Sequence, residues 1–254
     1  TIINNTLYIG CKNGKIHCYE IDNSSVLLKG TFHTASVNLI DYYVESDKDI
    51  YHIDDGAAIG NCKITKLMSD ESRLIVCGDY GRVASCSFNK NVWTNFKGEA
   101  INAGQVDSII YNDGTALNNK NIVDAIIYSN SKLIIIGEEG YVASCNLSTG
   151  NWSKYDGTTE NHSSNGSGPG IYNNGTILGG KNPTCALRIG NTIFISGEYG
   201  RIASINVITG GVTEYRGTTP DISSEISGPG YYYTGSDLAN ANTTTSITND
   251  AEHG

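Results

Sequence analysis

The chain has 254 residues, 39% of them hydrophobic, which is enough for a full all-β core, and its 26 acidic and 17 basic residues leave a formal net charge of −9 at pH 7. No segment combines basic with aromatic residues, so the surface that would neutralise phosphates is missing and we expect no nucleic-acid partner. No apolar run approaches the roughly 20 residues that span a bilayer, so we expect no membrane insertion.

Four segments align with one another without a gap, and each combines an apolar run, a glycine turn and a run of small residues. In chain order they are NTLYIGCKNGKIHCYEI from Asn5, SRLIVCGDYGRVASCSF from Ser72, SKLIIIGEEGYVASCNL from Ser131 and NTIFISGEYGRIASINV from Asn191. Their turn glycines, Gly14, Gly81, Gly140 and Gly200, are spaced by 67, 59 and 60 residues. This period is typical of propeller blades.

The strands of one repeat can be predicted from its alternation of apolar runs and turns. The fourth repeat contains, in order, CALRI from Cys185, TIFIS from Thr192, RIASINV from Arg201 and VTEY from Val212. The second run is apolar on both faces, as expected for a strand between two neighbouring sheets. The third run carries small side chains where another backbone can come close. No segment shows a sustained helical period, so we expect very little helix.

We therefore predict a four-bladed β-propeller, an all-β fold of about 60-residue repeats with four antiparallel strands in each blade. A single domain is expected over residues 1–254, with repeat cores near 5–30, 62–97, 122–157 and 184–217. Because Ile247 is in register with Leu187 and Thr1, the C-terminal segment 241–250 is predicted to pair with the N-terminal blade and close the ring. An open solenoid and a fragment of a larger ring are the alternatives.

Residues that would carry catalysis or bind a metal are not apparent. The seven cysteines form no C-x-x-C and most of them sit in apolar runs, so we interpret them as buried free thiols. The five histidines show no metal-ligand spacing, and nothing supports a cofactor or calcium. No nucleophile elbow or dinucleotide fingerprint is present. We predict a non-enzyme, with a glycoside hydrolase or lyase as the less favoured alternative.

The candidate ligand-binding residues lie in the long connections and at repeated positions of the blades. The connections are rich in Tyr, Gly, Asn, Ser and Thr, a composition typical of recognition loops, although a solvated connector would look the same. Aromatic residues recur in or after the fourth strand, where they could stack on a sugar or pack between blades. Carboxylates recur at the glycine turn, where they could bind a cation or sugar hydroxyls or simply be solvated. The candidates are Tyr172, Tyr232, Tyr233, Asn161 and Asn174 in the loops, Trp93, Trp152, Tyr155 and Tyr215 near the fourth strand, and Glu138 and Glu198 at the turn.

The repeated G-x-x-G-x-[IV]-A-S, T-G-x-W and Y-x-G-T units resemble those of phage tail and receptor-binding proteins and of some bacterial surface propellers. This resemblance implies a virion, extracellular or cell-surface protein that recognises polysaccharide or anchors another component. We predict a non-catalytic propeller that binds a glycan or cell-surface polysaccharide through several weak sites. The alternative is a structural or docking propeller whose partners are other subunits of a virion or surface assembly.

Overall fold

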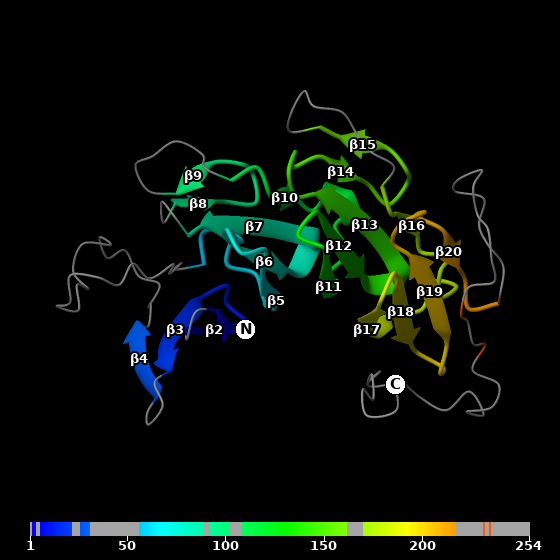
Figure 1. Ribbon diagram of the computed structural model, residues 1–254, viewed down its shortest axis with the longest axis horizontal. Coiled ribbons are helices and arrows are strands. Elements are labelled where there is room, and N and C mark those ends of the chain that lie inside the picture. Colours follow the sequence, from blue (N-terminus) through cyan, green and yellow to red (C-terminus); the bar gives the residue numbers. More distant parts are fainter. Residues whose placement is uncertain are drawn as a thin grey trace. The chain divides into compact units, whose positions relative to one another are not determined.

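The computed structural model describes residues 2–3, 6–21, 26–30, 56–88, 92–101, 108–161, 170–216, 231 and 234 (Figure 1). Within this part of the chain all regular structure is β-strand, apart from three short 3₁₀ turns. No helix among these residues could cross a bilayer. The chain divides into two compact units, residues 1–114 and 115–254, and each unit contains two antiparallel sheets.

In the first unit, the first sheet has its strands in chain order. They are β1 (Ile2–Ile3), β2 (Thr6–Gly10), β3 (Ile16–Ile21) and β4 (Val26–Gly30). The second sheet follows the same order and adds β10 beside β7. Its elements are β5 (Ile64–Ser69), β6 (Arg73–Gly78), η1 (Asp79–Gly81), β7 (Arg82–Ser87), β8 (Val92–Thr94), β9 (Ala100–Ile101) and β10 (Asn112–Asp113).

The second unit also contains a six-stranded and a four-stranded sheet, in the opposite order along the chain. The 3₁₀ turn η2 (Thr115–Leu117) precedes the third sheet, and η3 (Glu138–Gly140) joins two of its strands. The strands of this sheet are β11 (Ile122–Tyr128), β12 (Lys132–Gly137), β13 (Tyr141–Asn146), β14 (Trp152–Ser153), β15 (Thr159–Glu160) and β16 (Asn173–Asn174). The fourth sheet contains β17 (Pro183–Ile189), β18 (Thr192–Gly197), β19 (Ile202–Asn206) and β20 (Val212–Thr213). The predicted all-β architecture of repeated antiparallel sheets is therefore confirmed. The four sheets are separate, and the segment 241–250 lies outside the described residues, so ring closure stays a prediction.

The glycine turn joins the second and third strands of each repeat. The residue before its second glycine adopts a left-handed backbone in three sheets, with φ of 61° at Tyr80, 58° at Glu139 and 60° at Tyr199. The glycine that follows is left-handed as well, with φ between 67° and 81° across the four sheets. Glycine adopts the left-handed conformation without the strain that a side chain adds, so it lowers the cost of placing two left-handed residues in succession. This is the physical reason for the recurring glycine.

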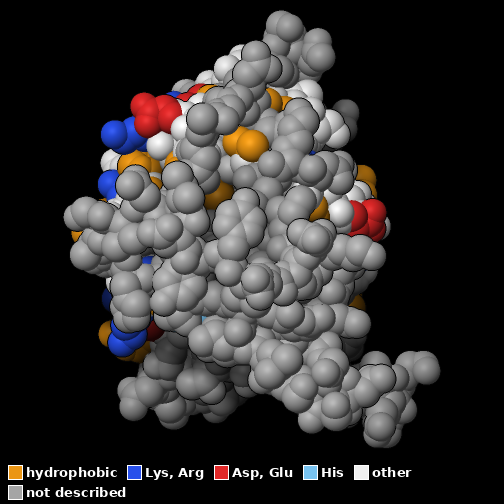
Figure 2. Space-filling model, turned by 90° about the vertical axis from the view of Figure 1, so that its left-hand side faces the viewer, with side chains coloured by type: hydrophobic (Ala, Val, Ile, Leu, Met, Phe, Trp, Pro, Cys, Tyr) orange, Lys and Arg blue, Asp and Glu red, His pale blue; other side chains and the backbone are white. Residues whose placement is uncertain are grey.

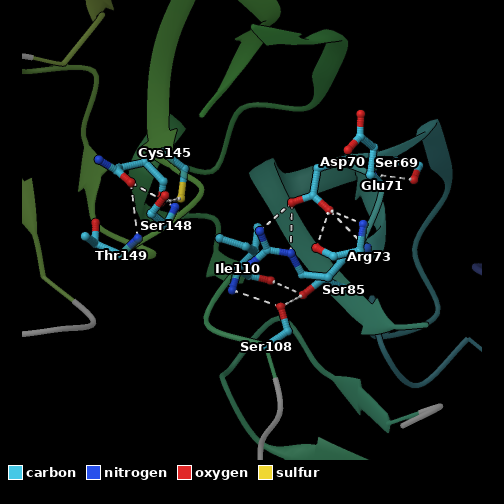
Figure 3. A network of polar contacts seen from close by, with 12 residues as sticks. Ser69, Asp70, Glu71, Arg73, Ser85, Ser108, Ile110, Cys145, Ser148 and Thr149 are labelled. Atoms are coloured by element: carbon cyan, nitrogen blue, oxygen red, sulfur yellow. Dashed lines mark hydrogen bonds and ion pairs between the residues drawn. The ribbon is translucent and has the colours of Figure 1, made fainter. Parts of the chain in front are cut away.

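The small residues of the third strand allow a returning segment to approach. In the second unit, the hydroxyls of Ser144 and Ser204 accept hydrogen bonds from the backbone N–H groups of Ile171 and Tyr231, both at 2.8 Å. In the first unit, the Ser85 hydroxyl lies 2.6 Å from the carbonyl oxygen of Ile110 (Figure 3). The prediction that another backbone comes close to these serines is confirmed.

Each unit has an apolar core between its two sheets. In the first unit, Tyr8 and Ile16 of the first sheet pack with Leu74, Val76 and Trp93 of the second. In the second unit, apolar side chains of β12, β13, β18 and β19 form the equivalent cluster. The first and the fourth sheet each also carry an exposed apolar side chain. Ile9 of the first sheet is 41% exposed and Tyr231 beside the fourth sheet is 64% exposed.

The cysteines whose side chains the structure describes are all free thiols. Cys62, Cys77, Cys86 and Cys145 are buried, whereas Cys11 and Cys185 are half-buried. Burial raises the pKa of the Cys62 thiol, although the neighbouring Arg82 guanidinium acts in the opposite direction. A thiol with a raised pKa is a poor nucleophile at neutral pH, which agrees with a packing role. The side chain of Cys18 lies outside the described residues.

Candidate functional site

Aromatic and cationic side chains gather at the glycine-turn end of the second sheet. The guanidinium carbon of Arg82 lies 4.2 Å from the centre of the Phe96 ring and 5.3 Å from that of Tyr80. Arg82 Nη1 also donates to the carbonyl oxygens of Ile59 and Gly60, both at 3.3 Å. The stack of Tyr80, Arg82 and Phe96, called here the second-sheet platform, is therefore held by backbone contacts as well as by cation–π attraction.

A larger cluster occupies the same place on the fourth sheet. Arg201 lies 4.1 Å from the Tyr215 ring centre and 5.9 Å from that of Tyr199, and its Nη1 donates to the carbonyl oxygen of Leu178 at 2.6 Å. Two further cations lie beside these rings: Lys181 Nζ is 5.0 Å from Tyr199, and the Arg216 guanidinium is 5.0 Å from Tyr215. The fourth-sheet platform is defined as Lys181, Tyr199, Arg201, Tyr215 and Arg216.

A left-handed glycine makes room for each arginine. An added Cβ at Gly60 would lie 2.5 Å from Arg82 Nη1, and one at Gly179 would lie 2.8 Å from Arg201 Nη1. The two glycines have φ of 69° and 63°. The corresponding residue of the third sheet is Asn118, and there the arginine itself is absent. The glycine and the arginine stack therefore occur together in these sheets.

The third sheet has the same backbone turn but different chemistry. Tyr141 stands where the other two platforms have arginine, and its ring packs on Tyr155 with a centroid separation of 5.1 Å. Lys120 lies over Tyr141 and forms an ion pair with Glu139 at 2.7 Å. The third sheet therefore presents a neutralised lysine and an aromatic pair.

The repeated carboxylates Glu138 and Glu198 each accept hydrogen bonds from an asparagine of the same sheet region. Glu138 Oε1 accepts from Asn121 Nδ2 at 3.0 Å, and Glu198 Oε1 accepts from Asn182 Nδ2 at 3.2 Å. Their second oxygens accept from the backbone N–H groups of the same asparagines, at 3.4 and 3.2 Å. Each carboxylate thus holds the residue that precedes the first strand of its sheet. This contact accounts for the recurrence of the acids without a ligand.

Trp93 and Trp152 are core residues. Each is 1% exposed, and each lies opposite a buried cysteine of the third strand, Cys86 or Cys145. No ring face is open to a sugar. Of the two interpretations of these tryptophans, stacking on a ligand is corrected to packing, because neither indole is accessible.

The loop candidates are placed only in part. Tyr172 is half-buried and its ring covers the turn at Gly157, where an added Cβ would lie 2.8 Å from Tyr172 Cζ. Tyr111 covers Gly98 in the same way in the first unit. Asn161 and Asn174 are exposed and belong to no platform. Tyr232 and Tyr233 lie outside the described residues.

Of the predicted site residues, the structure brings Tyr155 and Tyr215 into the aromatic clusters at the turns. Phe96 joins them from the same repeat position. Sequence reasoning missed the other residues of these clusters, namely Tyr80, Lys181, Tyr199 and Arg216. The signal for two of them was the shared turn sequence, D-Y-G-R and E-Y-G-R, in which tyrosine stands two residues before arginine. Among the side chains coloured in Figure 2, basic groups lie mainly along the left-hand edge and acidic groups at both edges, without a large area of one charge.

No protein-family model matches the chain, and no curated protein matches it. Among solved structures it is similar to the extracellular domain of a hybrid two-component system from B. thetaiotaomicron, at 16% identity and a TM-score of 0.43, covering 83% of this chain and 22% of the other. It is also similar to the computationally designed Ika8 protein, at 12% identity and a TM-score of 0.40, covering 87% and 60%. BamB from Moraxella catarrhalis matches at 12% identity and a TM-score of 0.37, covering 84% and 50%. The chain therefore spans less than two thirds of each of these structures.

Proposed function

We propose that this chain is a non-catalytic recognition module that binds a glycan or cell-surface polysaccharide through its repeated platforms. One observation carries the proposal: Tyr80 and Tyr199 occupy the same turn position in two sheets and are 55% and 45% exposed. Each ring lies beside an arginine that is itself anchored, so the ring is presented in a defined place. Tyrosine supplies amphipathic contact area at low entropic cost, which suits the apolar face of a sugar.

Replacing both tyrosines, Tyr80→Ala with Tyr199→Ala, is expected to lower binding to an immobilised polysaccharide by about tenfold, because two weak sites are lost from a multivalent contact. The measurement is a glycan array that includes bacterial surface polysaccharides, followed by biolayer interferometry. Ile208→Ala is the matched control, since Ile208 is 59% exposed but lies in the turn between β19 and β20. Unchanged binding in the double variant would contradict the proposal, and release of sugar products would favour the hydrolase or lyase.

A second candidate function is protein docking within a virion or surface assembly. It is favoured by large apolar side chains exposed at one end of the fourth sheet, where Val207 N–H bonds to the carbonyl oxygen of Asn191, since Ile189 is 41% and Ile208 is 59% exposed. Exposed apolar groups in proximity are typical of protein contact sites. The repeated motifs support the same extracellular or virion setting for both functions. If the chain binds no glycan on the array, protein docking is the favoured function.

We also propose that the four sheets close into a four-bladed propeller. Support comes from repeat positions: Ile9 is 41% exposed although its equivalents Val76 and Ile195 are 1% and 0% exposed, and Tyr231 is 64% exposed although its equivalent Ile171 is 0% exposed. In addition, β1 pairs with only Thr6 and Leu7 of β2, whereas β17 pairs along the whole of β18. A neighbouring sheet and a strand from residues 241–250 would cover these positions.

Deleting residues 241–254 tests this closure. The deletion is expected to lower the hydrogen-exchange protection of β2 beyond Leu7, where β1 does not pair with it, since an uncovered strand opens more readily than a central one. Exchange in β18 of the second unit serves as the internal control. A β2 segment that exchanges at the same rate with and without the tail would show that the tail does not pair there.

A further inference from the structure

We propose that the fourth-sheet platform is an anion site that binds the carboxylate of an acidic sugar. This inference rests on the proposed function and specifies its ligand class. It is drawn from the charges that surround Tyr199 and Tyr215, and from the contrast with the third sheet, which repeats the same backbone with different side chains.

The platform concentrates positive charge in an acidic chain. Lys181, Arg201 and Arg216 all lie within 6 Å of a tyrosine ring centre, in a protein with a formal net charge of −9. Among the described residues, none of the three cations forms an ion pair. Glu198, the acid of this turn, keeps its negative charge but is held by Asn182 and not by one of these cations. A ligand carboxylate would therefore displace no ion-pair partner of the three cations among the described residues.

The rings of this platform orient cations as well as offering an apolar surface. Tyr215 has two guanidinium groups near its ring, at 4.1 and 5.0 Å. Stacked guanidinium groups keep their planar N–H edges free to bind a carboxylate with two parallel hydrogen bonds. Of the guanidinium nitrogens of Arg201, only Nη1 has a hydrogen-bond partner in the described part of the chain. We therefore assign Arg201 and Arg216 to the carboxylate, Lys181 to long-range attraction, and the 45% exposed Tyr199 ring to the sugar face.

The third sheet shows what the same backbone does without this chemistry. Lys120 occupies the position of Lys181 but is paired with Glu139 at 2.7 Å. Asp156 occupies the position of Arg216, and its pKa is lowered mainly by a hydrogen bond from the Thr158 hydroxyl, so it carries a negative charge at neutral pH. Acidic side chains at these positions repel a carboxylate. The second-sheet platform, with Arg82 and Lys97 beside Phe96, is expected to bind more weakly than the fourth.

The test compares polygalacturonate with its fully methyl-esterified form, in which each carboxylate is neutral, by biolayer interferometry on the full chain. We expect the acid to bind about tenfold more tightly than the ester, with a preference that weakens as salt screens the charges. The double variant Lys181→Gln with Arg216→Asp removes two of the three cations of the fourth-sheet platform, and it introduces the acid that the third sheet has at the position of Arg216. It is expected to lower affinity for the acid about tenfold and to leave the ester unchanged. Lys120→Gln is the matched control and should change neither.

Each outcome decides between the two proposals. Equal affinity for acid and ester, or an acid affinity that the double variant does not change, overturns the anion site while leaving sugar recognition intact. Heparin serves as a second, sulfated polyanion. If the double variant loses the same affinity for heparin as for polygalacturonate at every salt concentration, the anion site is also overturned, because the platform would then be a non-specific polyanion surface. If the chain binds neither polygalacturonate nor its methyl ester, and binds no sugar on the glycan array, the proposed function itself is overturned.

Discussion

Replacing Trp93 by alanine is expected to lower the free energy of unfolding by about 3–5 kcal/mol, the range for deleting a large aromatic side chain from a packed core. The indole is 1% exposed and belongs to the core cluster of the first unit, with Ile59, Leu74 and Cys86. Its removal leaves a cavity that a β-sheet held by backbone hydrogen bonds on both sides cannot fill. Urea denaturation followed by circular dichroism measures the loss.

The same experiment decides between packing and ligand stacking at this position. Trp93→Phe keeps most of the apolar volume and is expected to cost less than the alanine variant, while leaving polysaccharide binding at the wild-type level. Trp152→Phe should behave in the same way in the second unit, where the indole is also 1% exposed. A Trp93→Phe protein of unchanged stability that no longer bound polysaccharide would return this residue to the ligand site.

Gly170→Ala is the second substitution with a large expected effect. An added Cβ would lie 1.5 Å from Ser153 Oγ and 1.9 Å from Ser153 Cβ, which is closer than any non-bonded contact. The segment would have to move away from β14, and the hydrogen bond from Ile171 N–H to Ser144 would be lost with it. We expect a loss of about 3 kcal/mol, at the upper end of the usual cost of overpacking. Thermal or urea denaturation measures it.

Two further variants separate steric overlap from other effects. Gly180→Ala meets no atom within 4 Å, so only its φ of +71° opposes the substitution, and we expect a cost of about 1 kcal/mol. Ser153→Gly removes the side-chain atoms that the new methyl group would strike, and it is expected to rescue much of the stability of Gly170→Ala. A double variant as unstable as the single one would show that the segment does not lie against Ser153.

Features of this protein that depend on neighbouring residues along the chain could be predicted from the sequence. The left-handed turn needs glycine at Gly81, Gly140 and Gly200 because of a local backbone conformation, and so its period is visible in the sequence. Apolar runs and small-residue runs predict strands for the same reason, since side-chain alternation is set within a strand. The repeat, the all-β class and the approach of a second backbone to Ser144 followed from these local rules.

What only the tertiary structure decided is which side chains are free to act. Glu198 is used by Asn182, and Arg201 is held by Leu178 and Tyr215, through contacts between residues 14 to 23 positions apart. No local rule selects such partners, because they meet only when strands and loops pack. The burial of Trp93 likewise depends on a neighbouring sheet. The repeated motif therefore determined the scaffold, whereas packing decided which tyrosines and cations on that scaffold remain available to a ligand.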